Sequence, residues 1–338
     1  MPINRYIRQT LLDSFGEEGQ GKLRGATVAV VGLGALGTHH AETLVRMGVG
    51  RLMLVDRDIV ELDNLHRQGL FTEDDASRAL PKAEAAAAHL KQINSDVEIT
   101  PHIDHLGPGN IRGLLRGADI ILDGTDNFIT RYLLNDYSRA ENIPYIYCGV
   151  VGYEATCFPI LPDGPCLRCL FRDMPDPSTE PACDTAGVWP PVVEVISGFA
   201  VDLALRWTAG IPPTDGWPLI FVDLTTGTIK RRPVMGLRAD DCPACGGNYE
   251  FLDSEETHTV HMCGAGAFQV LGQGKNVDFT KVQAKLKGAI NISVKPHIMQ
   301  IDVGEEVTIS LFRDGRAIIR GAHDAGRAKA IYDKYIGS

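Results

Sequence analysis

Ala26-Thr27-Val28-Ala29-Val30-Val31-Gly32 and, directly after it, Leu33-Gly34-Ala35-Leu36-Gly37 form the stretch of sequence that decides the fold. Its first part is an apolar run that ends in glycine, which predicts a buried strand of a parallel sheet. A helix is expected from residue 35 to residue 47. Glycines at 32, 34 and 37 would let the backbone approach a phosphate, and a helix N-terminus attracts negative charge. The stretch predicts a nucleotide site, with a glycine turn used only for tight packing as the alternative.

Strands and helices alternate after this turn. Buried strands are expected near residues 51–56, 97–102, 119–123 and 144–148, and helices over 81–88 and 192–208. Strict alternation predicts a parallel sheet whose two faces are covered by helices. We therefore expect an α/β fold with a Rossmann-like, mostly parallel sheet.

The character of the sequence changes after Cys245-Gly246-Gly247. From residue 257 onward the pattern predicts a strand, a helix, several strands between residues 290 and 319, and a last helix over residues 325–336. A chain of 338 residues also exceeds the usual size of one domain. The sequence thus predicts a first domain of residues 1–249 and a small α+β domain of residues 250–338.

Composition excludes several classes of protein. With 44% hydrophobic and 22% charged residues, the chain resembles ordinary globular proteins. Its formal net charge is -10, from 43 acidic and 33 basic residues, which leaves no basic footprint for nucleic acid. The sequence has no apolar run long enough to cross a bilayer, and its first residues lack the apolar core of a signal peptide. We expect a cytoplasmic protein with neither a nucleic-acid nor a membrane partner.

Four of the eight cysteines form two pairs, Cys166-x-x-Cys169 and Cys242-x-x-Cys245. Two such knuckles are the usual way to close a tetrahedral structural Zn²⁺ site, and four sulfur ligands leave no open position for catalysis. The alternative, two reactive dithiols, would require redox partners that the sequence does not indicate. We therefore predict a Zn²⁺ site on these four thiols.

The remaining cysteines divide into core and loop candidates. Cys148 and Cys157 fall in predicted strands and are expected in the core. Cys183 lies in a segment rich in proline, where a thiol near a helix start could act as a nucleophile because helix dipoles lower thiol pKa values. An idle thiol is the alternative for Cys183. Cys263 suggests no function.

Charged residues at the ends of the predicted strands indicate which nucleotide would bind. Asp56 ends the second strand, where a carboxylate can accept hydrogen bonds from a ribose. Arg67 and Lys82 follow, and Asp126 comes just after the fourth strand. Attack of a carboxylate on the α-phosphate of ATP joins two anions, so it needs cations around the triphosphate and a carboxylate for Mg²⁺. ATP is therefore favoured over NAD, although an NAD-dependent oxidoreductase and a zinc-stabilised binding scaffold remain alternatives.

An ordered series of motifs resembles the ThiF, MoeB and HesA adenylyltransferases, bacterial relatives of the ubiquitin-activating enzymes. The series covers residues 4–249 and comprises Arg5-Tyr6-Ile7-Arg8-Gln9, the glycine turn, Val55-Asp56-Arg57-Asp58, Asn64-Leu65-His66-Arg67-Gln68, Pro81-Lys82, Asp123-Gly124-Thr125-Asp126-Asn127 and both cysteine pairs. Residues after 250 resemble the C-terminal extension of ThiF-like proteins from Bacillus-type bacteria.

The resemblance implies an activity and its partners. The enzyme would use ATP to adenylylate the C-terminal glycine carboxylate of a small ubiquitin-like sulfur-carrier protein, ThiS-like or MoaD-like and ending Gly-Gly. This reaction prepares a thiocarboxylate for thiamine or molybdopterin biosynthesis. The C-terminal region lacks the arginine of a rhodanese anion loop, so a separate protein is expected to donate sulfur.

The resemblance also assigns roles to individual residues. It implies a homodimer in which Arg8 reaches the nucleotide of the partner subunit and Cys183 stands where relatives form a covalent link with the carrier. The nucleotide-binding set contains Gly32, Gly34, Ala35, Gly37, Asp56, Asp58, Asn64, Arg67, Lys82, Asp126 and Asn127. Within it, Asp56 and Asp58 would serve the ribose, Asn64, Arg67 and Lys82 the phosphates, and Asp126 the Mg²⁺ ion. Ala35 replaces a glycine of some members.

Overall fold

The computed structural model describes residues 5–174, 186–254, 259–262, 267–272, 277–286, 291–304 and 306–337. The chain divides into two compact units, one of residues 1–76 and 81–255, the other of residues 77–80 and 256–338. The domain limits 1–249 and 250–338 stay a prediction.

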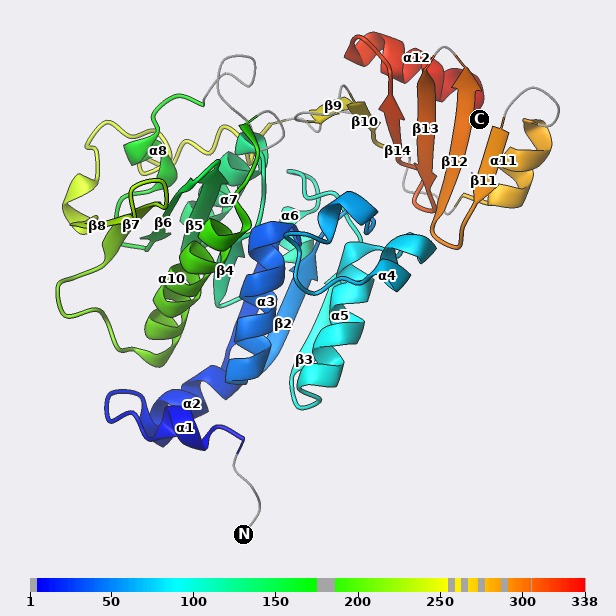
Figure 1. The fold of residues 1–338 in the computed structure, drawn as a ribbon. Coiled ribbons are helices and arrows are strands. Elements are labelled where there is room, and N and C mark those ends of the chain that lie inside the picture. Colours follow the sequence, from blue (N-terminus) through cyan, green and yellow to red (C-terminus); the bar gives the residue numbers. More distant parts are fainter. Residues whose placement is uncertain are drawn as a thin grey trace. The chain divides into compact units, whose positions relative to one another are not determined.

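The first unit is built on an eight-stranded sheet with the order β3-β2-β1-β4-β5-β6-β7-β8 (Figure 1). The first five strands of this order, β3-β2-β1-β4-β5, pair in parallel. The pairs β5-β6, β6-β7 and β7-β8 are antiparallel. The strands are β1 (Thr27–Val31), β2 (Arg51–Val55), β3 (Glu98–His102), β4 (Ile120–Asp123), β5 (Tyr145–Val151), β6 (Glu154–Ile160), β7 (Pro218–Asp223) and β8 (Thr228–Pro233). The predicted, mostly parallel sheet is confirmed, and β1 to β5 match the five predicted strands.

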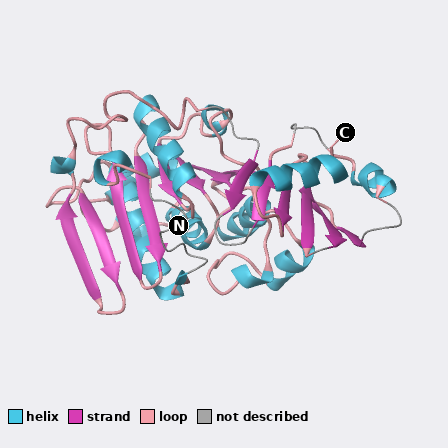
Figure 2. Cartoon of the chain, turned by 90° about the horizontal axis from the view of Figure 1, so that it is seen from above, coloured by secondary structure: helices cyan, strands magenta, loops and turns pink. Residues whose placement is uncertain are grey.

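Helices cover both faces of this sheet (Figures 1 and 2). Helices α3 (Ala35–Met47), α5 (Lys82–Ile93) and α10 (Pro190–Ala209) lie on one face, and α6 (Ile111–Leu114), α7 (Phe128–Glu141) and α8 (Leu167–Leu170) on the other. Shorter elements complete the unit: α1 (Ile7–Thr10), α2 (Gly16–Gly25), η1 (Leu62–Asn64), the first four residues of α4 (Glu73–Arg78) and η2 (Met235–Leu237). The predicted helices are α3, α5 and α10, with Pro81 as the N-cap of α5 rather than in its first turn.

The strand order creates a switch point beside β1. From β1 the chain proceeds to β2 and β3 on one side, and later to β4 and β5 on the other side. Ligands of open α/β sheets bind at such a point, at the carboxyl ends of the strands. A ligand site is therefore expected in the loops that follow β1, β2 and β4.

The second unit is a six-stranded antiparallel sheet with the order β11-β12-β13-β14-β10-β9. Its elements are β9 (Thr259–Met262), β10 (Ala267–Val270), α11 (Phe279–Lys285), β11 (Asn291–Val294), β12 (Ile298–Gly304), β13 (Val307–Phe312), β14 (Ala317–Arg320) and α12 (Ala325–Tyr335). Alternate strand residues, such as Ile301, Ile309 and Ile319, form one apolar core with α12. The expected small α+β fold is confirmed.

In the part of the chain that the structure describes, no helix combines the length and the apolar character that a membrane crossing requires.

One buried histidine in α3 predicts a pH dependence of stability. His40 is fully buried, and among the residues that the structure describes neither of its ring nitrogens has a hydrogen-bond partner. Burial, and then the neighbouring His39, lower the pKa of His40 to about 3 from 6.5. Below pH 6.5 the unfolded chain binds a proton at this residue and the folded chain does not, so the stabilisation present above that pH is lost as pH falls.

We expect His40 to account for a loss of about 2 kcal/mol in the free energy of unfolding between pH 8 and pH 5. Urea unfolding of the wild type and of His40→Leu at the two pH values measures it, because the difference between the two proteins isolates this group. His39→Gln, which changes a more exposed neighbour, is the control. Equal pH dependence in the wild type and His40→Leu would contradict the prediction.

Candidate functional site

Two backbone segments, the glycine turn after β1 and the loop after β4, meet where these strands end. A Cβ atom on Gly37 would lie 1.8 Å from Gly32 O, and one on Gly124 would lie 2.2 Å from the same oxygen. Gly32 has a φ of +84°, and a Cβ there would lie 2.6 Å from Gly124 O. The glycine turn and the loop after β4 therefore pack backbone against backbone, which only glycine allows at these three positions.

Gly34 differs from these three glycines. It is the N-cap of α3, immediately before Ala35, and its φ is −76°. The nearest heavy atom to a Cβ placed on Gly34 would be Gly124 O, at 3.8 Å. The fold has room for a methyl group here, so the fold does not require glycine at residue 34. A phosphate that approaches the backbone closely does require it.

Replacing Gly34 with alanine is expected to weaken ATP binding by about tenfold while the free energy of unfolding changes by less than about 1 kcal/mol. The added methyl group would occupy the space of the phosphate rather than space inside the protein. Calorimetric titration with ATP and urea unfolding measure the two quantities. Gly21→Ala, in open space on α2, is the control. Unchanged ATP affinity would count against a phosphate at Gly34.

Asp56 joins the glycine turn to the segment after β2. Its Oδ2 accepts a hydrogen bond of 2.6 Å from Leu33 N, and its Oδ1 accepts one of 2.7 Å from Asp58 N. Its exposed fraction is 9%. Burial raises the pKa of the Asp56 carboxyl, against the opposing effect of Lys82. Each oxygen retains a lone pair, so the carboxylate can still accept from a ribose.

Lys82 is a buried cation among carboxylates. Its Nζ lies 3.7 Å from Asp58 Oδ2, and its backbone nitrogen donates to Asp58 O at 2.8 Å. Burial acts to lower the pKa of Lys82, but Asp58, Asp56 and Asp126 outweigh it and raise the pKa above its usual value. Lys82 is therefore charged at neutral pH, and its charge acts on predicted site residues of two loops, Asp56 and Asp58 after β2 and Asp126 after β4.

Asn64 and Arg67 lie on and just after η1. Asn64 Oδ1 accepts from Glu61 N at 3.1 Å, and its Nδ2 donates to Asp63 Oδ1 at 3.0 Å, so its side chain caps this turn. Arg67 Nη1 donates to Asp63 O at 2.8 Å. Within the described ranges, Arg67 has no carboxylate partner. Its guanidinium therefore remains available to an anion.

Asp126 and Asn127 follow β4. Asp126 is exposed, and its Oδ1 lies 3.3 Å from Asn127 Nδ2. Asn127 is the N-cap of α7, and its Oδ1 accepts from Thr130 N at 2.9 Å. The structure thus gives Asn127 a role in starting the helix, whereas its nucleotide contact stays a prediction.

A buried ion pair beneath this loop was missed by the sequence analysis. Arg131 Nε lies 3.3 Å from Asp123 Oδ2, and the exposed fractions of the two side chains are 8% and 0%. Arg131 Nη2 also donates to Thr125 O at 2.7 Å, while Thr125 N and Tyr145 OH donate to Asp123. The pair fixes the loop that carries Asp126. The sequence shows only an arginine one helical turn after Asn127, a spacing that does not by itself reveal the partner Asp123.

Arg8 does not join these residues within its own chain. It lies exposed on α1, whose Gln9 Nε2 donates to Met47 O at 2.9 Å. Met47 ends α3, about 20 Å from the glycine turn where the helix begins. Figure 1 shows α1 at the end of α3 away from that turn. A contact of Arg8 with nucleotide would therefore have to be made in another subunit.

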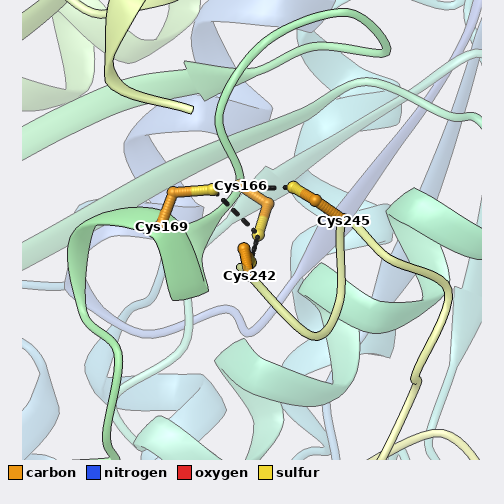
Figure 3. Close-up of side chains that lie close together, drawn as sticks. All are labelled: Cys166, Cys169, Cys242 and Cys245. Atoms are coloured by element: carbon orange, nitrogen blue, oxygen red, sulfur yellow. Dashed lines mark hydrogen bonds between the residues drawn. The ribbon is translucent and has the colours of Figure 1, made fainter. Parts of the chain in front are cut away.

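The four paired cysteines converge (Figure 3). The Sγ atoms of Cys166, Cys169, Cys242 and Cys245 all lie within 4.8 Å of one another, and three of the distances are 3.5, 3.5 and 3.8 Å. A tetrahedron with zinc–sulfur bonds of about 2.3 Å has edges of about 3.8 Å. The two knuckles, far apart in sequence, thus form a group of thiols that fits a metal ion.

Two buried residues of α7 hold the knuckles in place. Asn135 Oδ1 accepts from Leu167 N, next to Cys166, at 2.7 Å. Its Nδ2 donates to Asp136 Oδ1 at 3.2 Å, and Asp136 Oδ2 accepts from Phe251 N at 2.9 Å. Burial raises the pKa of Asp136 to about 6. One helix therefore anchors both segments that carry the thiols.

Replacing Asn135 with alanine is expected to reduce the free energy of unfolding by about 1–3 kcal/mol, because it leaves the Leu167 N–H unpaired. Release of Zn²⁺ from the loaded protein to a chromogenic chelator should also accelerate. Ser138→Ala is the matched control, since Ser138 is buried in the same helix but donates to Ile143 O. Equal release from the two variants would contradict a specific effect on the knuckles.

The structure describes two of the other four cysteines. Cys148 and Cys157 are fully buried and face each other across β5 and β6, so their expected place in the core is confirmed. Burial raises the pKa of both thiols. Cys183 and Cys263 lie outside the described residues.

Comparison with known proteins identifies the family of the chain. The profile of the ThiF family matches residues 6–244. The chain belongs to the ThiF family. The resemblance stated from sequence motifs is thereby confirmed.

Named ThiF-family relatives cover the chain to different extents. A sulfur carrier protein ThiS adenylyltransferase of Bacillus subtilis strain 168 is 39% identical over 98% of this chain and 99% of its own length. The protein of the same name from Escherichia coli strain K12 is 37% identical over 72% of this chain and 95% of its own length. The SAMP-activating enzyme E1 of Haloferax volcanii is 37% identical over 72% and 89%.

Solved structures show the same fold. The crystal structure of E. coli MccB with ATP has a TM-score of 0.62 and 25% sequence identity, covering 72% of this chain and 75% of that one. A crystal structure of E. coli MccB with MccA-N7isoASN has a TM-score of 0.63, again at 25% identity and the same coverage.

Proposed function

We propose that this ThiF-family chain uses MgATP to adenylylate the C-terminal glycine carboxylate of a small ubiquitin-like sulfur carrier, ThiS-like or MoaD-like and ending Gly-Gly. The observation that carries the proposal is Lys82, a buried cation beside Asp56, Asp58 and Asp126 at the switch point of the sheet. The names of the relatives support the substrate class. Thiamine or molybdopterin biosynthesis would use the product.

The charges of the site suit this reaction. Lys82 and Arg67 would neutralise the triphosphate as the carrier carboxylate attacks the α-phosphorus and displaces pyrophosphate, which leaves the carrier as an acyl-adenylate. The exposed carboxylate of Asp126 would bind the Mg²⁺ ion that accompanies ATP. Asp56 would accept from the ribose, assisted by Asp58, and Asn64 and Asn127 would line the phosphate side. The protein contributes position and charge, since the reaction needs little other chemistry from it.

The same proposal extends to the metal and to the assembly. The four-thiol group would hold Zn²⁺, which stabilises the fold and takes no part in catalysis. The enzyme would be a cytoplasmic homodimer in which Arg8 contacts the nucleotide of the partner subunit. The Cys183 thiol would attack the carboxyl carbon of the adenylylated carrier, displace AMP and form a thioester, and a separate protein would supply sulfur.

Carrier-dependent exchange between ATP and pyrophosphate tests the proposal. ThiS of Bacillus subtilis should support exchange by the wild-type protein, whereas Asp126→Ala and Arg67→Ala should abolish most of it. Exchange that survives both substitutions, or that needs no carrier, would count against the assignment. Normal thiocarboxylate formation by Cys183→Ser would remove the covalent step alone.

A further inference from the structure

Two aromatic side chains stand exposed at the carboxyl edge of the first sheet. Tyr153 and Trp189 have exposed fractions of 49% and 46%, and their ring centroids lie 5.5 Å apart. The backbone holds them together, because Gly152 N donates to Gly187 O and Trp189 N donates to Gly152 O, each at 2.9 Å. Large half-exposed rings fixed in this manner are typical of anchors in protein interfaces.

The distance between this aromatic pair and the nucleotide site can be estimated along strand β5. Arg131 Nη2 donates to both Thr125 O and Cys148 O, so Cys148 in β5 is level with the loop after β4. Strand β5 continues three residues beyond Cys148, to Val151, before the turn that carries Tyr153. At about 3.3 Å per residue, the aromatic pair stands roughly 10–15 Å beyond that loop.

We propose that Tyr153 and Trp189 anchor the tail of the carrier, a proposal that rests on the function proposed above. An extended chain from the pair to the α-phosphate would span about 10–15 Å, the length of roughly three to five residues. The rings would therefore contact an apolar residue located about four or five positions before the terminal glycine. The partner is a protein with an extended C-terminus, small at its end and apolar just upstream.

The strand that separates the anchor from the site supports this path. Val151, the last residue of β5, is 37% exposed, so the carboxyl end of β5 offers an apolar surface between the aromatic pair and the nucleotide site. The anchor touches neither the glycine turn nor Lys82, so it contributes to carrier binding and not to ATP binding. Its loss should raise the KM for the carrier while the KM for ATP and kcat at saturating carrier change little.

Alanine variants of the pair, assayed with ThiS of Bacillus subtilis, test the proposal. We expect Trp189→Ala and Tyr153→Ala each to raise the KM for ThiS in pyrophosphate exchange by about 10- to 100-fold. Trp189→Phe, which keeps a ring, should remain within about threefold of the wild type. Ile229→Ala is the matched control, because Ile229 is 51% exposed on β8, three strands away. An unchanged KM for ThiS in both alanine variants would overturn the proposal.

Three further measurements separate the other outcomes. Sedimentation velocity shows whether the pair instead joins two copies of this chain, and dissociation of Trp189→Ala into smaller species would overturn the proposal. Calorimetric titration with ThiS tests the anchor independently of catalysis. If the wild type catalyses no exchange but binds ThiS more tightly than Trp189→Ala does, the proposed function fails and the anchor does not. Double-mutant cycles with alanine at ThiS positions three to six from its end should couple to Trp189 only at the fourth or fifth.

Discussion

Replacing Lys82 with methionine is expected to lower carrier-dependent pyrophosphate exchange by about 10²- to 10³-fold, the usual effect of removing one preorganised charge from a transition state. Lys82 is 7% exposed and carries a raised pKa, so it holds its proton throughout the neutral range. Without it, Asp56 and Asp58 would face an incoming triphosphate with no buried cation between them. Steady-state exchange at saturating ATP and carrier measures the loss.

A matched substitution separates this charge from a general effect on α5. Lys91 lies in the same helix, but its Nζ donates to Ser95 O and Val97 O. Lys91→Met should therefore leave exchange within about twofold of the wild type, since surface contacts of this kind contribute little. Thermal unfolding without nucleotide shows whether Lys82→Met remains folded. A folded Lys82→Met variant with normal exchange would remove Lys82 from the reaction.

The parallel half of the first sheet could be predicted because its strands are buried on both faces. Val28 to Val31 are at most 2% exposed, and such strands appear in sequence as uninterrupted apolar runs. The antiparallel edge could not be predicted in the same manner. Five of the six residues of β8 are exposed, and Lys230, Arg231 and Arg232 give it no apolar periodicity. Only its pairing with β7 makes it a strand.

The candidate site divides along a similar line. The positions of residues that follow buried strands, such as Asp56 and Asp126, could be predicted because parallel strands end at the same edge, whereas their contacts with a nucleotide stay predictions. The convergence of the two cysteine pairs could be predicted because two knuckles are the usual way to bind a tetrahedral metal ion, whereas the Zn²⁺ ion itself stays a prediction. Arg131 was not, since its partner Asp123 lies in another element and helical spacing alone does not reveal a buried charge. Asn64 and Asn127 show the converse, because an amide near a predicted site also caps a helix or turn.

Removing the charge of Arg131 should be among the most destabilising single changes in the first unit. Arg131→Met is expected to reduce the free energy of unfolding by about 3–5 kcal/mol, because it leaves the buried carboxylate of Asp123 without its ion-pair partner. Urea unfolding at pH 7.5 measures the change. Arg112→Met is the control. Arg112 pairs with Glu141, which lies on the same helix as Arg131, but this pair is exposed and should contribute at most about 1 kcal/mol.

The cause of this loss can be separated from lost packing. The guanidinium of Arg131 also lies over the rings of Phe128 and Tyr147, at 5.4 and 5.3 Å from their centroids. If the uncompensated charge dominates, adding Asp123→Asn to Arg131→Met should restore about half or more of the stability, because a neutral amide costs less to bury. If packing over the rings dominates, the double variant would stay as unstable as Arg131→Met, and the ion pair would have to be judged a minor contributor to the loop that carries Asp126.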